Sequence, residues 1–321
     1  MRLFVTGGSG FVGGAFIKAA VAQGHAVLAM ARSDASAKAV EALGASAVRC
    51  ELGAVPASAL QGVEAVVHAA AHTEEFGPRD VFWKVNVEGT EQLLEAAREA
   101  KVPRFVLVST EAVLFMGKDL HDVDESYPYP RFTPFLYSET KAAAEQRVLA
   151  ANAPGFTTLA VRPRMVWGPG DVTILPAVAA MVRSGAFRWI DRGRARTHTT
   201  HIANAVHGLM LALTRGAGGK AYFVTDDEET TIKDFFTQYL ATQGLTPPEA
   251  SVPSWVAEPL AAGLERLWSL TGRKGKPPLT KLAVTLMTKD CLLNIDRARQ
   301  ELGYAPQVSL AEGLKTMPRP A

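Results

Sequence analysis

The feature that most constrains the fold stands at the N-terminus, where "TGGSGFVG" (residues 6–13) follows an apolar run and opens an alanine-rich, helix-like stretch. Gly7, Gly10 and Gly13 have the spacing G-x-x-G-x-x-G. Glycines between a strand and a helix allow a tight turn, close approach of backbone to a phosphate, and close packing of the helix on the strand. N–H groups of the first helical turn, including those of Phe11 and Val12, then face the phosphates. We expect a dinucleotide-binding βαβ unit; the alternative is a glycine-rich turn with no ligand.

The alternation of strands and helices continues along the first half of the chain. Apolar runs recur at "HAVLAMAR", "VEAVVHAAA", "RFVLVST" and "TTLAVRPRMVWG", with helical stretches between them. This order predicts an α/β fold: a Rossmann-type, doubly wound parallel sheet with helices on both faces. The pattern loosens after Gly168. We therefore expect an NAD(P)-binding domain over 1–168 and a smaller C-terminal substrate-binding region over 169–321, of which about 199–226 returns to the main sheet.

Bulk composition excludes several classes of protein. A net charge of +2 over 321 residues gives no case for nucleic-acid binding. Two cysteines exclude a disulfide framework. The N-terminus reaches glycine too early for a signal peptide, and no apolar run approaches the roughly 20 residues that span a bilayer. The expected location is the cytoplasm.

The end of the second expected strand, "LAMARSD", indicates which dinucleotide is bound. An NAD-selective protein places an acid there for the ribose 2′-hydroxyl, but this position falls on Ala31 and is followed by Arg32 and Ser33. Because a guanidinium suits a 2′-phosphate, NADP(H) is favoured and NAD(H) is left open. Asp34 argues for NAD(H), and a solvated Arg32 is the plainer alternative.

The stretch "FLYSETKAAAEQR" (135–147) places Tyr137 and Lys141 four residues apart among good helix formers. Four residues are about one turn, so the two side chains share a helix face. One interpretation is a surface helix with a solvated lysine. The other is an acid whose proton affinity the lysine lowers.

Six motifs in order resemble the extended short-chain dehydrogenase/reductase family: "TGGSGFVG", "HAAA" (68–71), "NVEGT" (86–90), "VST" (108–110), "YSETK" (137–141) and "RPRMVWGPGD" (162–171). Within it, the chain looks most like the 3β-hydroxysteroid dehydrogenase branch, which includes sterol-4-carboxylate dehydrogenases and 2-alkyl-3-ketoalkanoate reductases. The resemblance implies that Tyr137 is the proton donor or acceptor. It makes Lys141 both the charge that lowers the Tyr137 pKa and a ligand of the nicotinamide ribose. Thr110 would hydrogen-bond the substrate oxygen.

The remaining motifs of the resemblance serve the cofactor. Asn86 is expected to brace the sheet. The residues expected to contact the cofactor are Gly7, Gly10, Phe11, Val12, Arg32, Ser33, Glu51, Leu52, Ala69, Ala70, Ala71, Lys141, Pro163 and Val166.

Two later segments suggest substrate contacts. The run "RWIDRGRARTHT" (188–199) holds four arginines, and we select Arg196 as a ligand for a carboxylate or diphosphate, against a solvated loop. Residues 255–270 place Trp255 and Trp268 on one apolar helical stripe. Such a stripe is most often core; the alternatives are a lid over an apolar substrate or a face on a membrane, with "GRKGK" just beyond it.

Two other clusters of polar residues do not predict a further catalytic or metal site. His198, His201 and His207 lack an acid at metal-ligand spacing, so no metal site is expected. Asp226, Asp227, Glu228 and Glu229 are interpreted as a solvated loop.

The preferred hypothesis is an NAD(P)(H)-dependent oxidoreductase acting on the 3-oxygen of a bulky, apolar small molecule such as a 3β-hydroxysteroid, a sterol or a long-chain 3-keto acid. A nucleotide-sugar epimerase or dehydratase is the first alternative, since that class shares Tyr, Lys and Ser/Thr. A non-enzymatic NADP-sensing regulator is the second. A homodimer and a peripheral membrane contact through the C-terminal region are left open.

Overall fold

A parallel sheet of seven strands forms the centre of the computed structural model, which describes residues 1–273 and 275–318. The strand order is β12-β7-β5-β4-β1-β2-β3, and each neighbouring pair is parallel. This confirms the doubly wound α/β fold. Most of the strands are buried because helices cover both faces, but no residue of the edge strand β3 is buried. Their bounds are β1 Arg2–Thr6, β2 Ala26–Ala31, β3 Ser46–Arg49, β4 Ala65–His68, β5 Arg104–Val108, β7 Thr157–Pro163 and β12 Ala221–Val224.

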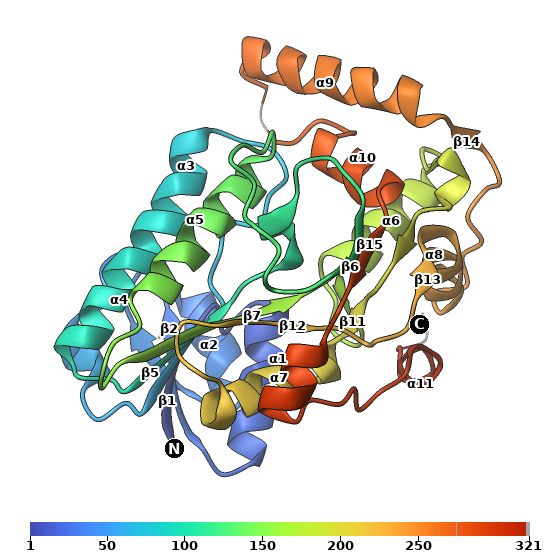
Figure 1. The fold of residues 1–321 in the computed structure, drawn as a ribbon. Helices are drawn as coiled ribbons and strands as arrows, with labels where there is room; N and C mark the ends of the chain where they lie inside the picture. The colour runs from blue at the N-terminus through green and yellow to red at the C-terminus, as the bar shows by residue number, and fades with distance from the viewer. Residues whose placement is uncertain (274, 319–321) are drawn as a thin grey trace.

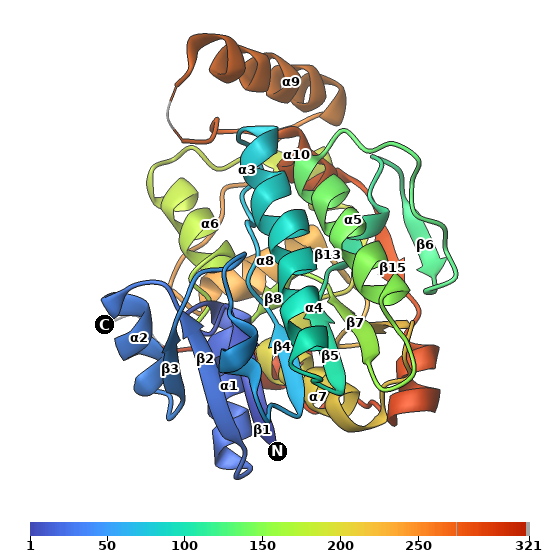
Figure 2. The ribbon, with the colours of Figure 1, turned by 90° about the vertical axis from the view of Figure 1, so that its left-hand side faces the viewer.

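Helices pack on the two faces of this sheet (Figure 1). α1 (Phe11–Ala22) packs against α7 (Ile202–Arg215), while α4 (Gly89–Glu99) packs against α5 (Leu136–Ala150). Figure 2 shows α3 (Arg79–Trp83) and α4 in line, with α5 beside them. α3 and α4 are joined by a π-helical turn, Lys84–Glu88, so the two form one long helix with one wide turn. α2 (Asp34–Glu41) joins β2 to β3.

The order of the strands creates a crevice at the centre of the sheet. The chain runs outward from β1 to β2 and β3, then returns to place β4 on the other side of β1. Thr6, at the end of β1, is in register with His68, at the end of β4. Ligands of open α/β sheets bind at such a switch point, outside the carboxyl ends of the strands.

The rest of the chain builds a smaller region above that end of the sheet. It holds a four-stranded sheet in the order β13-β10-β15-β6 and two short strand pairs, β11 with β8 and β14 with β9. α7 and β12 lie in the main sheet layers, while the division at residue 168 stays a prediction. The bounds are β6 Leu120–Val123, β8 Val166–Trp167, α6 Ile174–Arg183, β9 Trp189–Ile190, β10 Arg196–Thr197, β11 Thr200–His201, β13 Thr230–Thr231, α8 Ile232–Ala241, β14 Ser251–Val252, α9 Ser254–Thr271, α10 Lys281–Thr288, β15 Cys291–Leu293 and α11 Leu310–Lys315.

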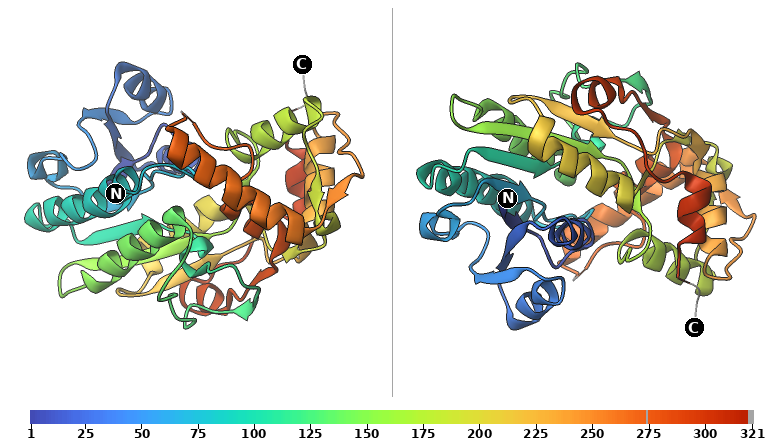
Figure 3. Two further views of the ribbon diagram at one scale, coloured as in Figure 1. Left: turned by 90° about the horizontal axis from the view of Figure 1, so that it is seen from above. Right: turned by 90° about the horizontal axis from the view of Figure 1, so that it is seen from below.

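α9 lies across the outside of the molecule (Figures 1 and 3). Only Ala257 and Ala261 of this helix are buried, in a small cluster with Ile190 and Val284. Trp255 is 74% exposed, so the expectation that the 255–270 stripe is core was wrong. Small alanines let α9 approach α10 closely, and the larger apolar side chains are left facing outward. No helix in the described ranges combines the length and hydropathy needed to cross a membrane.

Candidate active site

The glycine loop closes onto the backbone that follows β4. Gly7 has φ +69°, and a Cβ there would lie 2.6 Å from the Ala69 carbonyl carbon and from the Ala70 nitrogen. A Cβ on Gly13 would lie 2.3 Å from the Gly7 oxygen. Side chains at either position are therefore excluded. The structure thus brings two of the predicted cofactor motifs, more than 60 residues apart in sequence, into direct contact.

The start of α1 is suited to a pyrophosphate. Gly10 is the N-cap residue, and neither a capping side chain nor an acidic residue occupies the first turn. The N–H groups of Phe11 and Val12 therefore keep their partial positive charge at the crevice. Together with the glycine cradle, this arrangement fits a dinucleotide.

The C-terminal ends of β2 and β3 form the expected 2′-phosphate region. Arg32 is exposed, and Ser33 caps α2 by accepting a hydrogen bond from the Ser36 N–H. Arg49, opposite Ala31 in the sheet register, donates to the Asp34 carboxylate at 2.5 Å. Asp34 was the feature that argued for NAD(H), and this ion pair offsets its charge. Our sequence reasoning missed Arg49; its place at the end of the third strand was the available signal.

The three expected catalytic residues come together where β5 ends and α5 begins. Lys141 is buried, and its ammonium donates to the Val108 carbonyl at 2.8 Å. Thr110 follows two residues later, and its hydroxyl lies within hydrogen-bonding reach of the Tyr137 phenol. Tyr137 and Lys141 are one turn apart on α5, as the spacing predicted.

The electrostatics at Tyr137 differ from the sequence expectation. Burial and the nearby negative charge of Glu111 raise the Tyr137 pKa above its ordinary value, whereas Lys141 was expected to lower it. Burial lowers the pKa of Lys141 to about 8. Tyr137 therefore stays a protonated acid at neutral pH.

A buried ion pair beside Thr110 escaped the sequence reasoning. Glu111 and Arg164 are both almost fully buried, and Arg164 Nη1 donates to Glu111 Oε1 at 2.7 Å. The Thr110 hydroxyl donates to Glu111 Oε2 at 2.7 Å. Arg164 Nε also donates to the Thr197 hydroxyl at 2.7 Å. The available signal was a glutamate inside the apolar run "VSTEAVLF" and a second arginine in "RPRMV".

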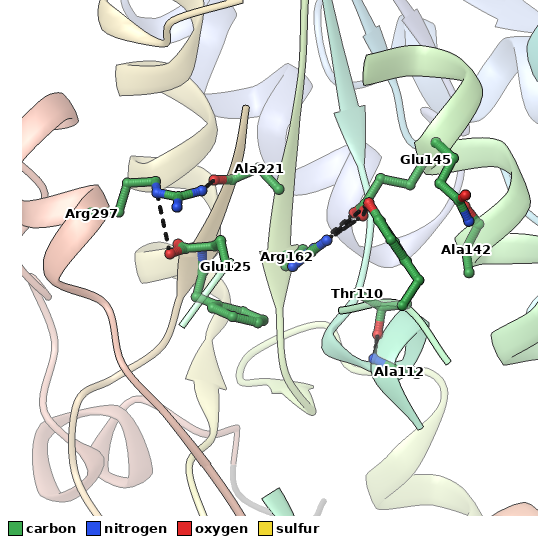
Figure 4. A network of polar contacts seen from close by, with 11 residues as sticks. Thr110, Ala112, Glu125, Ala142, Glu145, Arg162, Ala221 and Arg297 are labelled. Atoms are coloured by element: carbon green, nitrogen blue, oxygen red, sulfur yellow. Dashed lines mark hydrogen bonds and ion pairs between the residues drawn. The ribbon is translucent and has the colours of Figure 1, made fainter. Parts of the chain in front are cut away.

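A second buried ion pair fixes α5 to the sheet (Figure 4). Arg162 on β7 points at Glu145 on α5, with Nη2 to Oε1 at 2.5 Å and Nε to Oε2 at 3.0 Å. The Tyr129 hydroxyl donates to the same carboxylate at 2.5 Å. Glu145 lies on the helix face of Tyr137 and Lys141, two turns beyond Tyr137 and one turn beyond Lys141. The Arg162–Glu145 pair thus fixes the distance between β7 and the face of α5 that carries Tyr137 and Lys141.

Asn86 has the bracing role expected of it. Its side-chain oxygen accepts from the His72 N–H at 2.7 Å, and its amide donates to the His72 carbonyl and to the Thr140 hydroxyl, both at 3.0 Å. Asn86 thereby joins the loop after β4 to α5, next to Lys141.

A cavity of about 320 Å³ opens between the start of α5 and the outer helix α9. Leu136, which precedes Tyr137, lines it, together with Phe76 from the loop after β4 and Arg266 from α9. Glu75, Glu265 and Lys281 make its border charged. None of the three expected substrate residues lines this cavity.

The three residues expected to contact the substrate, Arg196, Trp255 and Trp268, lie outside this cavity. Arg196 is exposed and bonded to two carboxylates, Asp290 at 3.1 Å and Glu229 at 3.2 Å, so its guanidinium is already paired. Trp255 faces outward, and Trp268 lies half-buried under the Arg273 guanidinium, 5.0 Å from the ring centroid. The structure does not gather them around Tyr137, and their substrate roles stay predictions.

Asp226 corrects the interpretation of 226–229 as a solvated loop. It is buried and accepts hydrogen bonds from Trp167 Nε1, the Thr199 hydroxyl, the His201 N–H and the Asn204 amide. These four donors compensate its burial. Asp227, Glu228 and Glu229 are exposed, as expected.

The imidazoles of His198 and His201 are bonded to backbone. His201 Nδ1 accepts from Ala203 N–H at the start of α7, and His198 Nδ1 accepts from Leu293 N–H.

The remaining expected cofactor residues lie around the crevice. Leu52 packs closely on α4, where a Cβ at Gly89 would lie 2.8 Å from its Cγ, and Glu51 is exposed. Pro163 ends β7 and Val166 begins β8. Their contacts with a cofactor stay predictions.

Comparisons with known proteins agree with this geometry. Residues 4–253 match the 3-beta hydroxysteroid dehydrogenase/isomerase family. The 4-hydroxy-2-methyl-3-oxo-4-farnesyl-3,4-dihydroquinoline-1-oxide ketoreductase of Stigmatella aurantiaca is 43% identical over 320 residues, covering 99% of this chain and 96% of the relative. The 2-alkyl-3-oxoalkanoate reductase of Stenotrophomonas maltophilia (strain K279a) is 36% identical, covering 99% and 98%.

Solved structures share the fold along almost the whole chain. The crystal structure of gox2253 has a TM-score of 0.79 at 27% identity, covering 98% of this chain and 96% of that one. The UDP-glucuronic acid 4-epimerase from Bacillus cereus, solved in complex with NAD, has a TM-score of 0.75 at 19% identity, covering 99% and 97%. At that identity the likeness concerns the fold alone.

Proposed function

Because the chain belongs to the 3-beta hydroxysteroid dehydrogenase/isomerase family, whose members are extended short-chain dehydrogenases/reductases acting with a nicotinamide cofactor, we propose that it reduces the 3-oxo group of a bulky, apolar ketone with NADPH. The observation that carries this proposal is Tyr137. Its phenol stands at the start of α5 beside Thr110 and stays protonated at neutral pH, which is the state needed to donate a proton to a ketone oxygen.

The proposed roles follow from the contacts of each group. When bound, the cofactor supplies the hydride that the carbonyl carbon receives. Tyr137 gives its proton to the carbonyl oxygen, so the ketone becomes an alcohol and the phenol becomes a phenolate that solvent reprotonates. Thr110 holds the Tyr137 phenol in position for the substrate oxygen. Lys141, fixed to Val108, contacts the nicotinamide ribose and stabilises the phenolate as it forms.

The substrate class rests on similarity and on the cavity. The named relatives act on 3-oxo compounds that carry a farnesyl or alkyl chain, and others on sterols or 3β-hydroxysteroids. The cavity beside Leu136 is bounded by α9 and the loop after β4, with Phe76 on one side and Arg266 on the other. We assign Arg266, for which no acidic partner is found among the described residues, the role of binding a polar or anionic end of the substrate. The epimerase alternative has support from the fold but not from the relatives.

NADP(H) is the proposed form of the cofactor. Arg32 is exposed at the end of β2, and Arg49 offsets the charge of Asp34 on the neighbouring strand. Two guanidinium groups at this edge suit a 2′-phosphate better than a free hydroxyl.

The test is a substrate panel followed by NADPH absorbance. We expect turnover of a 2-alkyl-3-oxo acid, a 3-ketosteroid or a prenylated 3-oxo heterocycle, and none of a UDP-sugar. Tyr137→Phe should lower kcat by about 10²–10⁴ while NADPH still binds with a similar Kd, because the hydroxyl acts only in proton transfer. Near-normal kcat in that variant would overturn the mechanism, and turnover of a UDP-sugar would favour the epimerase alternative.

We also propose that α9 rests on a membrane surface, from which an apolar substrate can enter. Trp255, Leu260, Leu267 and Leu270 on its outer side are 43–76% exposed. Arg273 is exposed near this apolar face, which suits anionic headgroups. Lys274 of the "GRKGK" run lies outside the described residues.

Vesicle flotation tests this contact. The protein should float with phosphatidylglycerol vesicles more than with phosphatidylcholine vesicles, and Leu267→Asp/Leu270→Asp should abolish flotation. Phe132→Asp is the matched control, since Phe132 is 75% exposed but lies away from α9 in sequence. Failure of the wild type to float contradicts the proposal. If light scattering shows a dimer that only the α9 variant dissociates, the face belongs to a homodimer instead.

A further inference from the structure

The Glu111–Arg164 ion pair is buried, and a buried ion pair contributes little to the free energy of unfolding. Two charges removed from water lose hydration that their mutual attraction only partly restores, and such pairs are often replaceable by apolar residues. Here both side chains are at most 4% exposed. Arg164 Nη2 also lacks a partner among the described residues. A functional role would explain why the protein has two charged residues, Glu111 and Arg164, at this buried position.

The hydrogen bonds around the pair have a defined direction. A threonine hydroxyl has one proton, and Thr110 gives its proton to Glu111 Oε2. The Thr110 oxygen also accepts from the Ala112 N–H at 3.2 Å, which Figure 4 shows as a dashed line. Its remaining lone pair is available to the Tyr137 phenol, the neighbouring donor. The series therefore runs from Tyr137 through Thr110 to Glu111 and ends at Arg164.

We propose that Glu111, held by Arg164, is a positioning residue for this reaction: its carboxylate takes the Thr110 proton and so leaves the Thr110 oxygen to hold the Tyr137 phenol. The negative charge of Glu111 also favours the neutral, proton-donating phenol. The inference rests on the proposed function, since it takes Tyr137 as the acid. It explains why the chain keeps a buried carboxylate directly after Thr110. It also gives the site a bias toward ketone reduction near neutral pH.

Other titratable groups around the pair do not replace Glu111 in this role. Burial raises the pKa of Cys291 on β15 to about 12, and burial lowers the pKa of His198, so both are neutral near pH 7. Lys141 faces the site from α5 with a pKa lowered to about 8, and the charge that acts on it is Glu145 rather than Glu111. A change confined to Glu111 therefore acts on Tyr137 without first acting on Lys141.

The pH profile of Glu111→Gln is the decisive measurement. Loss of the negative charge should lower the Tyr137 pKa, so the alkaline fall in the reduction rate should move to lower pH by about one unit or more. The rise of alcohol oxidation with pH should move by the same amount, because both report one phenol. Glu111→Asp keeps the negative charge and should show the wild-type pH profile. Its shorter side chain should misplace Thr110 and thereby lower kcat.

Two further measurements keep the inference falsifiable. If Glu111→Gln alone does not fold, Glu111→Gln/Arg164→Met replaces the pair by neutral groups of similar size. That double variant should also move the profile to lower pH. An unmoved profile in a folded variant that binds NADPH overturns this inference alone. An active Tyr137→Phe variant would overturn the proposed function as well, so the two failures are distinguishable.

Discussion

Arg32 and Arg49 stand at the ends of adjacent strands, and only one of them has a partner among the described residues. Arg49 is bonded to Asp34, while Arg32 extends into solvent. We predict that Arg32→Ala weakens NADPH binding and spares NADH, because only NADPH carries the 2′-phosphate. A charge-assisted hydrogen bond contributes about 1.5–3 kcal/mol, which is roughly ten- to over a hundredfold in Kd.

Calorimetry with both cofactors checks this prediction. Lys38→Ala, which removes an exposed positive charge from α2, is the matched control and should leave both Kd values nearly unchanged. Equal weakening of NADPH and NADH by Arg32→Ala would mean that Arg32 acts on the shared part of the cofactor.

Single residues were predictable where the cause is local. The spacing of Tyr137 and Lys141 fixes their shared face, since the helical repeat needs no information from elsewhere in the chain. Glu111 and Arg164 are 53 residues apart, and only the folded sheet brings them together. The charges around Tyr137 were only partly predictable for the same reason. Local sequence contained the lysine, but burial and the charge of Glu111 come from tertiary structure.

The position of α5 against the sheet depends on the buried carboxylate of Glu145. Glu145→Ala leaves the Arg162 guanidinium, 2% exposed, without its partner in the interior. Removing one member of a buried ion pair destabilises a protein by about 3–5 kcal/mol, and we predict a loss of that size in the free energy of unfolding. Urea denaturation measures it.

The same helix offers a matched control. Glu139 pairs with Arg79 at the surface, where the two side chains are 36% and 57% exposed. Glu139→Ala should change the free energy of unfolding by less than about 1 kcal/mol. Equal effects of the two substitutions would show that burial of the Arg162 pair carries no special weight.

The helices and strands could be predicted from the periodicity of apolar residues, but the buried face of α9 could not. Apart from β6, the strands of 1–168 were expected in their observed order, because buried parallel strands and amphipathic helices carry strong patterns. α9 was expected to bury its large side chains. It buries Ala257 and Ala261 instead, since the approach to α10 leaves room only for small residues. Periodicity locates an apolar stripe but does not say which part of the helix the protein covers.

At the scale of the whole molecule, a buried histidine links stability to pH. The two ring nitrogens of His68 lie 2.6 Å from Thr6 Oγ1 and 2.9 Å from Thr90 Oγ1. Thr90 gives its own proton to the Asn86 carbonyl, so it accepts from the histidine, and Thr6 donates to the other nitrogen. The ring is therefore neutral. Burial, together with the charge of Lys141, lowers its pKa to about 3.

The sign of the pH dependence follows from proton uptake. Between about pH 6.5 and 3 an unfolded histidine binds a proton that folded His68 does not, so the free energy of unfolding decreases as pH falls through this window. Above it, His68 contributes no slope. We predict that His68→Gln reduces the slope between pH 5 and 6 by up to about 1.4 kcal/mol per pH unit. Urea denaturation of both proteins at several pH values checks this, and equal slopes would contradict it.

The outer helix is connected to the rest of the molecule through a contact on Glu75. Lys276 Nζ lies 3.4 Å from Glu75 Oε1, and the Thr280 hydroxyl donates to Glu75 Oε2 at 2.6 Å. Thr280 also caps α10 by accepting from the Ala283 N–H. One carboxylate on the loop after β4 thus connects the segment between α9 and α10 to the wall of the cavity that Glu75 itself lines.

We predict that Glu75→Ala loosens this segment and raises KM for the bulky ketone by about tenfold, which corresponds to roughly 1.4 kcal/mol. The Kd for NADPH should not change, because Glu75 is not among the residues expected to contact the cofactor. Glu74→Ala is the matched control, since Glu74 is exposed and makes no contact found among the described residues. If Glu75→Ala lowers kcat and leaves KM unaltered, the contact acts on Tyr137 rather than on substrate binding.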